Sequence, residues 1–358
     1  MGYLRPLDKH LTAALAALRA DDPEGALLRA IADDPSDPAR RDAWRAWITA
    51  QGGERAEFVA LQERAHAGET LSPKELVREK KLLTANAKAW LGPLAPVVKE
   101  PRFERGLLVE CLVVPSGTKT GAAVGDPRWA TVETVHCGAV KNKANDLLLH
   151  PVFRSLRRIQ GAPEALVEAL LHDPVERPLE AIECEAMHPR LLPATLRAPG
   201  LPRLREFWVS CWFRDDAVSK YTATWQPPSV LRPFLQSPLA AQLAVLYWNV
   251  HSVFVGDVAA ELTAHAPPNF TARVELYHLA LSRGPDGRWS RVEVTIHDVA
   301  EERRHLDAKL RTLLKLDPAE VRTIAVRIPA GQDASPLAEQ IAAVRDRFPQ
   351  AEVTITTG

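Results

Sequence analysis

The sequence lacks an excess of charge of either sign. Its 358 residues carry 45 Lys and Arg against 45 Asp and Glu, so the formal net charge at neutral pH is zero. Proteins that bind nucleic acids or anionic membrane surfaces usually have a marked positive balance. We therefore expect neither a nucleic-acid partner nor a membrane partner.

Long hydrophobic runs are also missing. The first residues, MGYLRPLDKHL, contain no apolar core of signal-peptide length, and no run of about 18 apolar residues follows them. These absences predict a cytoplasmic protein. Apolar residues nevertheless make up 46% of the chain, which is enough for a packed core, so we do not expect disorder.

Motifs that carry common enzyme or metal chemistry are absent. The sequence contains no CxxC pair, no GxxxxGK[ST] phosphate loop, no GxGxxG after a strand, no HExxH and no GxSxG. The cysteines at positions 111, 137, 184 and 211 are interpreted as buried free thiols. We predict no catalytic residue, no cofactor and no metal, and hence a protein that is not an enzyme.

A short phrase recurs down the middle of the chain: an aliphatic residue, two variable residues, an aliphatic residue, one variable residue, then a small or apolar residue. Its copies begin at Val132, Leu156, Leu179 and Leu204, which are 24, 23 and 25 residues apart. A fixed period of about 20 to 30 residues predicts a solenoid. Each period is expected to contain a strand and then a short helix, such as the one expected within Ala162–His172. This arrangement is similar to a leucine-rich repeat.

The chain before the repeats is expected to be helical. Asp37-Pro38 is typical of a helix start, and Ser72 with Glu75 predicts a capping box. From Leu107 to Val114 the β-branched residues predict a strand.

The end of the chain predicts an alternation of strands and helices. Strands are expected at Arg273–Leu281 and Arg291–His297, joined by a turn at Gly284–Gly287. A strand at Thr323–Ile328, a helix at Pro336–Arg347 and a strand at Glu352–Thr356 would then form a βαβ-like unit.

The stretch from Ala26 to Ala67 resembles the bacterial repeat-companion domain. The matching segments are Ala26–Ile31 with Asp34-Pro35, then Arg40 and Trp44 through Trp47-Ile48, Gly52, and Glu57–Gln62. The resemblance implies a bacterial protein in which a helical module precedes repeats, and it implies no chemistry. The acidic residues that the family carries after its second tryptophan are missing here, where Ile48-Thr49-Ala50 stands.

These observations together predict an α/β fold. An N-terminal helical module would occupy residues 1–95, an irregular leucine-rich-repeat-like solenoid residues 103–282, and a C-terminal capping α/β unit residues 283–358. The usual asparagine ladder of leucine-rich repeats is absent, because the corresponding positions are Val140, Glu164, Met187 and Trp212.

The variable positions of the phrase predict a binding surface. Alternate residues of a strand face opposite sides. If positions one, four and six of the phrase point inward near the turn, positions three and five line the concave sheet. Aromatic and Arg anchors among polar residues are typical of protein-binding hot spots. The predicted partner-binding residues are His136, Arg158, Gln160, Glu183, Glu206, Trp208 and Tyr247.

Alternatives remain open at this point. Trp208 and Tyr247 could be covered core, lying under the insertion at 213–228 or under the C-terminal unit. In place of a scaffold that binds a protein partner, the chain could be a regulatory or substrate subunit of a larger enzyme assembly. It could also be a hydrolase that uses His278, His297 or Asp298 where the solenoid meets the C-terminal unit.

Overall fold

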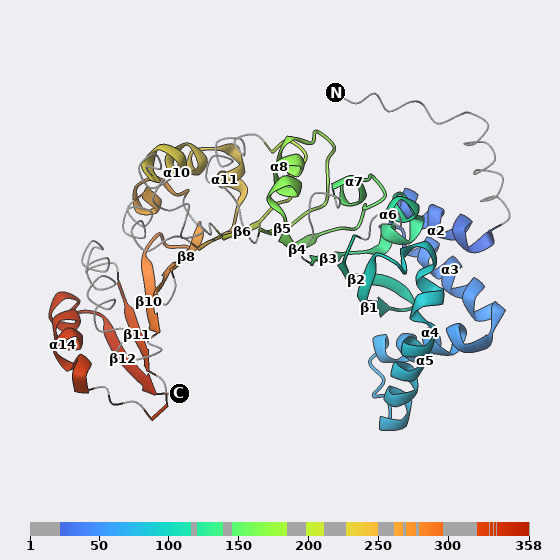
Figure 1. Cartoon of the computed structure of the whole chain (residues 1–358), viewed down its shortest axis with the longest axis horizontal. Coiled ribbons are helices and arrows are strands. Elements are labelled where there is room, and N and C mark those ends of the chain that lie inside the picture. Colours follow the sequence, from blue (N-terminus) through green and yellow to red (C-terminus); the bar gives the residue numbers. More distant parts are fainter. Residues whose placement is uncertain are drawn as a thin grey trace. The chain divides into compact units, whose positions relative to one another are not determined.

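The computed structural model describes residues 22–115, 120–138, 145–184, 198–210, 227–249, 261–267, 270–276, 279–295, 321–328, 330–331, 333 and 335–357. The chain divides into two compact units between Ile159 and Gln160, called unit 1 and unit 2 below. Helices come first, and a mixed sheet follows whose strands β1 to β12 succeed one another in chain order (Figure 1). The α/β class is therefore as predicted.

The helices of unit 1 begin where the sequence signals predict. They are α2 (Pro23–Asp33), α3 (Pro38–Gln51), α4 (Gly53–His66) and α5 (Pro73–Leu91). The Asp37 side chain accepts a hydrogen bond from the backbone N–H of Ala39 at the start of α3. Ser72 and Glu75 form the reciprocal capping box that opens α5. Both helix-start predictions are confirmed.

A β-hairpin follows the helices directly. Strand β1 (Val98–Glu104) pairs antiparallel with β2 (Leu107–Val113). The two turn residues, Arg105 and Gly106, have φ angles of 50° and 80°, which is the backbone geometry of a tight type I′ hairpin. The sequence predicts β2 but not β1.

The helices and the hairpin share one core. Trp44 is fully buried in a cluster that joins α2, α3 and α4 to β2, with Leu107 as the member from the strand. The Gln62 side chain, on α4, donates to the carbonyl of Phe103 and accepts from the N–H of Gly106. The hairpin turn is thereby fixed to the helices.

The remaining strands of unit 1 are parallel. Strand β3 (Thr134–Cys137) pairs with β2, with Glu110 opposite Thr134. The connection contains α6 (Thr120–Ala123) and the 3-10 helix η3 (Pro127–Thr131). Helix α7 (Asn145–Leu148) then precedes β4 (Arg158–Ala162), which spans the division between the units.

Unit 2 continues with parallel strands. Helix α8 (Glu164–His172) precedes β5 (Ala181–Cys184), which pairs with β6 (Glu206–Ser210). Then follow β7 (Val245–Asn249) and β8 (Thr271–Leu276).

One face of these strands is covered by helices. Helices α10 (Pro227–Leu235) and α11 (Pro238–Gln242) connect β6 to β7, and Figure 1 shows both on one side of the strands. Phe207 of β6 packs against Phe234 of α10, with ring centroids 6.5 Å apart. Positions three and five of the phrase therefore lie on the opposite face, called the open face below.

The last strands are arranged differently from the prediction in one place. The single strand predicted at Arg273–Leu281 is wrong: β8 ends at Leu276, and β9 (Leu279–Arg283) runs antiparallel to it. Strand β10 (Trp289–Thr295) pairs antiparallel with β9 through the predicted turn at Gly284–Gly287.

The predicted helix between two parallel strands is present at the end of the chain. Strands β11 (Thr323–Ile328) and β12 (Glu352–Thr357) are parallel, and α14 (Ala338–Arg347) connects them. Strand β11 also pairs in parallel with β10.

The recurring phrase has the same geometry in each copy. Positions one and four are buried in all four copies, and position six is buried in every copy except at Gly161, which is half-buried. The carbonyl at position two accepts from two N–H groups of the next copy, as Glu133 does from Arg157 and Arg158 at 2.9 and 3.0 Å. Glu180 does the same with Arg205 and Glu206. The inward-facing positions predicted from the sequence are confirmed, apart from Gly161.

Candidate functional site

The predicted partner-binding residues fall in both units. His136 and Arg158 belong to unit 1, whereas Gln160, Glu183, Glu206, Trp208 and Tyr247 belong to unit 2. Within unit 2, the strand register places Glu183 opposite Trp208, and Trp208 opposite Tyr247. Sequence reasoning had put these three side chains in one column, and the structure brings them side by side.

Trp208 and Tyr247 form a stacked pair on the open face. Their ring centroids are 4.6 Å apart and their planes differ by 21°, which is close to the distance between neighbouring strands. Both side chains are half-buried. Because each ring turns one face to the other, the pair presents mainly ring edges away from the sheet.

The indole N–H of Trp208 is a donor without an acceptor. It is shielded from solvent, and no hydrogen-bond partner for it is found in the structure as described. Buried indole N–H groups normally find a partner, and an unsatisfied one is costly. Because this N–H is shielded from solvent, an incoming partner cannot reach it in this arrangement, and it offers no binding contact.

Arginines extend the open face beyond the aromatic pair. Arg273 of β8 lies opposite Tyr247, and it belongs to the same column as the predicted residues. It was missed because the strand was expected to begin at Arg273 rather than at Thr271. Arg273 forms an ion pair of 3.2 Å with Glu293 of β10, to which Arg291 and Arg327 also bind.

His136 has a different environment, on the sheet of unit 1. Its Nε2 is 2.8 Å from a carboxylate oxygen of Glu110, and Arg102 binds the other oxygen of the same carboxylate at 2.7 Å. The His136 hydrogen bond is the main reason that the pKa of Glu110 is held below its usual value. The network orients His136, but no nucleophile beside it is identified among the described residues.

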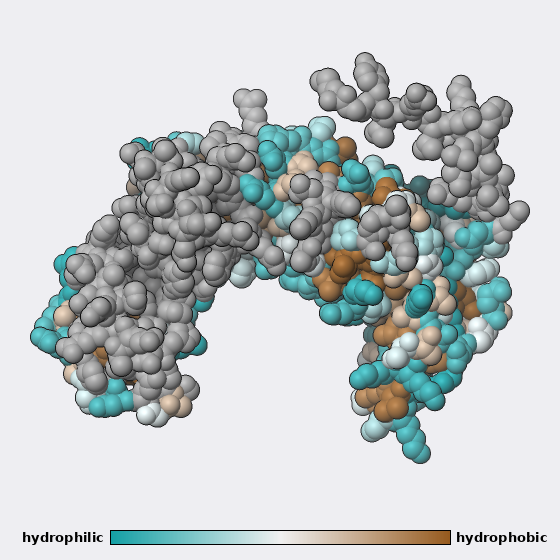
Figure 2. Space-filling model, viewed as in Figure 1, coloured by the Kyte–Doolittle hydropathy of each residue, from teal (hydrophilic) through white to brown (hydrophobic). Residues whose placement is uncertain are grey.

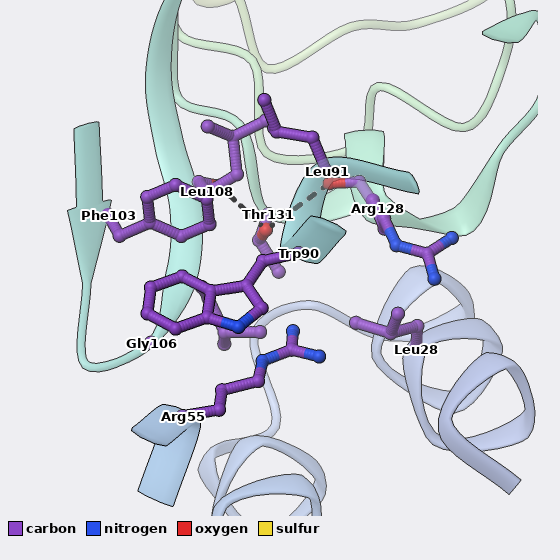
Figure 3. A pocket seen from close by; sticks show the side chains of 10 residues that line it. Leu28, Arg55, Trp90, Leu91, Phe103, Gly106, Leu108, Arg128 and Thr131 are labelled. Atoms are coloured by element: carbon purple, nitrogen blue, oxygen red, sulfur yellow. Dashed lines mark hydrogen bonds between the residues drawn. The ribbon is translucent and has the colours of Figure 1, made fainter. Parts of the chain in front are cut away.

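A small cavity lies between the helices and β2 in unit 1 (Figure 3). Its volume is about 10 Å³, which is room for about one water molecule. Arg55 lines it, paired with Glu24 at 2.7 Å and lying 5.2 Å from the centre of the Trp44 ring. Arg128 also lines it and is paired with Asp126 at 3.1 Å. Since both guanidinium groups have acidic partners, we interpret the cavity as part of the core.

The described residues give no support for metal or redox chemistry. No group of three or more His, Cys, Asp or Glu side chains that could hold a metal ion occurs among them. Cys111, Cys137 and Cys184 are buried free thiols, as predicted, and burial raises the pKa of Cys111 to about 12. Cys211 and the residues of the alternative hydrolase site, His278, His297 and Asp298, lie outside the described residues.

Figure 2 shows that the visible surface of unit 1 is largely hydrophilic, with small hydrophobic patches. Leu76 and Val77 at the start of α5 are exposed. Because adjacent helix residues point about 100° apart, these two do not form one apolar stripe. Within the described segments, no helix has the length and hydrophobicity needed to cross a membrane.

Comparison of the chain with protein-family models, with curated proteins and with solved structures found no match. The resemblance to the repeat-companion domain therefore stays a prediction. The functional argument depends on the geometry of the open face.

Proposed function

We propose that the protein is a non-enzymatic scaffold that binds a protein partner through the open face of unit 2. Trp208 and Tyr247 are the anchors of the interface, and Glu183 and Glu206 belong to its polar surround. The observation that carries the proposal is the stacked, half-buried aromatic pair on the face opposite the described helices α10 and α11. Trp and Tyr are the residues most enriched at binding hot spots.

A protein partner fits this face better than a sugar or a nucleobase. Proteins stack nucleobases on the open faces of aromatic side chains, and a sugar likewise packs one face of its ring there. In the Trp208–Tyr247 pair, one face of each ring is used for stacking. Ring edges suit the side chains of a polypeptide.

The finer architecture belongs to the same proposal: a degenerate leucine-rich-repeat-like solenoid preceded by a repeat-companion module. The constant spacing of the phrase, its buried positions and its repeated carbonyl pattern support this. Glu164, where a leucine-rich repeat would carry Asn or Cys, instead begins helix α8. The equivalent residues Val140, Met187 and Trp212 lie outside the described residues.

Substitutions on the open face test the proposal. Affinity-tagged full-length protein would be compared with the double variant Trp208→Ala/Tyr247→Ala by crosslinking and quantitative mass spectrometry in cells. Each truncation at a hot spot costs about 2 kcal/mol or more, so we expect recovery of the partner to fall at least 30-fold. Glu183→Arg is a second variant, since Glu183 is exposed beside Trp208 and its replacement leaves the core intact. The reversed charge beside the aromatic pair should change partner recovery, upward for an acidic partner and downward for a basic one.

Val175→Ala provides the matched control. Val175 is an exposed apolar residue of unit 2, located in the loop after α8, and its loss should leave partner recovery unchanged. The same set of recovered proteins from wild type, the double variant and Glu183→Arg would contradict the proposal. Circular dichroism of each variant separates loss of binding from loss of folding.

A further inference from the structure

Three arginines from three strands converge on one carboxylate of the open face. Arg273 of β8, Arg291 of β10 and Arg327 of β11 lie 3.2, 2.8 and 3.3 Å from the oxygens of Glu293. Their side chains are 40, 50 and 57% exposed, whereas that of Glu293 is only 14% exposed. A molecule that approaches this face therefore meets guanidinium groups, with the carboxylate beneath them.

This arginine cluster is continuous with the proposed interface. The register places Arg273 directly opposite Tyr247, Ser282 opposite Arg273, and Arg291 opposite Ser282. The alternate residues of β10, Val292 and Val294, are buried toward the other face. A polypeptide lying across the strands from Trp208 would thus pass from the aromatic pair to the arginines.

The contribution of these ion pairs to folding stability does not explain the arginine cluster well. Exposed ion pairs contribute about 0 to 1 kcal/mol each, and gathering three like charges around one carboxylate adds repulsion among them. Register also places Glu275 on this face, with its side chain outside the described residues. Even with Glu275 counted, the face over β8 to β11 has an excess of one positive charge, whereas the same face at β5 and β6 carries Glu183 and Glu206.

We propose that the partner segment bound beside Trp208 and Tyr247 is acidic, and that its Asp or Glu carboxylates bind Arg273, Arg291 and Arg327. The proposal rests on the proposed function and adds the chemistry of the partner. Guanidinium groups bind carboxylates through paired hydrogen bonds. Nucleic acid, whose phosphates also bind guanidinium groups, is the competing outcome that the measurements below distinguish.

Direct binding measurements on the full-length protein test this chemistry. A fluorescein-labelled hexaglutamate peptide would be titrated by fluorescence anisotropy, with hexalysine, oligo(dT) and inorganic phosphate as comparison probes. We expect hexaglutamate to bind, hexalysine not to bind, and added NaCl to weaken the complex.

Variants locate the binding. Arg291→Ala/Arg327→Ala should weaken hexaglutamate binding at least 10-fold, and Glu293→Gln should strengthen it because one negative charge is removed. Arg322→Ala is the matched control: Arg322 is 59% exposed and pairs with Asp286 instead of Glu293. Three results would each overturn the inference. The arginine double variant could bind hexaglutamate as tightly as the control does, or Glu293→Gln could bind it more weakly than wild type. Oligo(dT) or phosphate could also bind the wild-type protein at least as tightly as hexaglutamate does.

The two proposals fail in different ways. A partner that is lost with Trp208→Ala/Tyr247→Ala but retained with Arg291→Ala/Arg327→Ala would overturn the acidic-segment inference and leave the binding face standing. A partner set unaffected by the aromatic substitutions would overturn the proposed function, whatever hexaglutamate does.

Discussion

Replacing Gly106 with alanine should destabilise unit 1 through two separable effects. Gly106 has a φ of 80°, in the left-handed region that a residue with a Cβ adopts at a cost of about 1 to 2 kcal/mol. A Cβ at this position would also lie 2.4 Å from a methyl group of Val59 and 3.0 Å from the Trp44 ring. Overpacking of a well-filled core typically costs about 1 to 3 kcal/mol. The expected total is about 2 to 5 kcal/mol.

Gly68 isolates the first of these effects. Its φ of 86° is similar, but nothing lies within 4 Å of the position that a Cβ would occupy. Gly68→Ala should therefore cost only the conformational part, about 1 to 2 kcal/mol. The difference between the two variants measures how tightly the hairpin turn packs on the helices.

Urea denaturation followed by hydrogen–deuterium exchange is the suitable assay, because the chain has two units and a single spectroscopic signal would mix their transitions. Peptides covering α3 and α4 report unit 1. Their midpoint should fall by roughly 1 to 2 M urea in Gly106→Ala and by less in Gly68→Ala. If Gly106→Ala cost no more than Gly68→Ala, the shared core of hairpin and helices would be refuted.

Two further predictions concern titratable groups of unit 1. The Cys111 thiol, whose pKa is raised to about 12 by burial, should resist a thiolate-selective reagent in the folded protein and react after unfolding in urea; rapid labelling of the native state would contradict its burial. The pKa of Glu110 is depressed below its usual value of 4.5, chiefly by the His136 hydrogen bond. The ionised Glu110 carboxylate therefore contributes to stability above about pH 4.5, and this contribution is lost as the pH falls through the folded-state pKa. His136→Ala should therefore destabilise unit 1 more at neutral pH than at about pH 3, as measured by urea midpoints, and an equal loss at both pH values would show that the pair is not the cause.

The strand that the sequence failed to reveal has a physical explanation. Strand β1 contains Pro101 and several charged residues, and four of its seven side chains are exposed. Proline and charge are typical of edge strands, where they discourage pairing with other chains. They also remove the alternating apolar pattern from which a strand is predicted. Pairing with β2 and contact with the helices create this strand.

Local signals were sufficient where the determining interactions are local. The caps at Asp37 and Ser72 involve residues two or three positions apart, and the turn at Gly284–Gly287 closes within five residues. The period of the phrase likewise predicted which aliphatic residues are buried, because a strand alternates its side chains between two faces. These features were determined by the sequence itself.

The functional surface depends on interactions between distant residues. Trp208 and Tyr247 are 39 positions apart, and the phrase gave them a common column but not a stacked geometry. The chain reverses direction between β8 and β9, and no local sequence pattern predicted this reversal. It is this strand arrangement that places Arg273, Arg291 and Arg327 around Glu293. The sequence determined the helices, the strand period and the inward-facing residues. Only the pairing of strands in the folded protein decided which exposed side chains meet. The register places residues side by side that are far apart in the sequence, and no local sequence pattern predicts that contact.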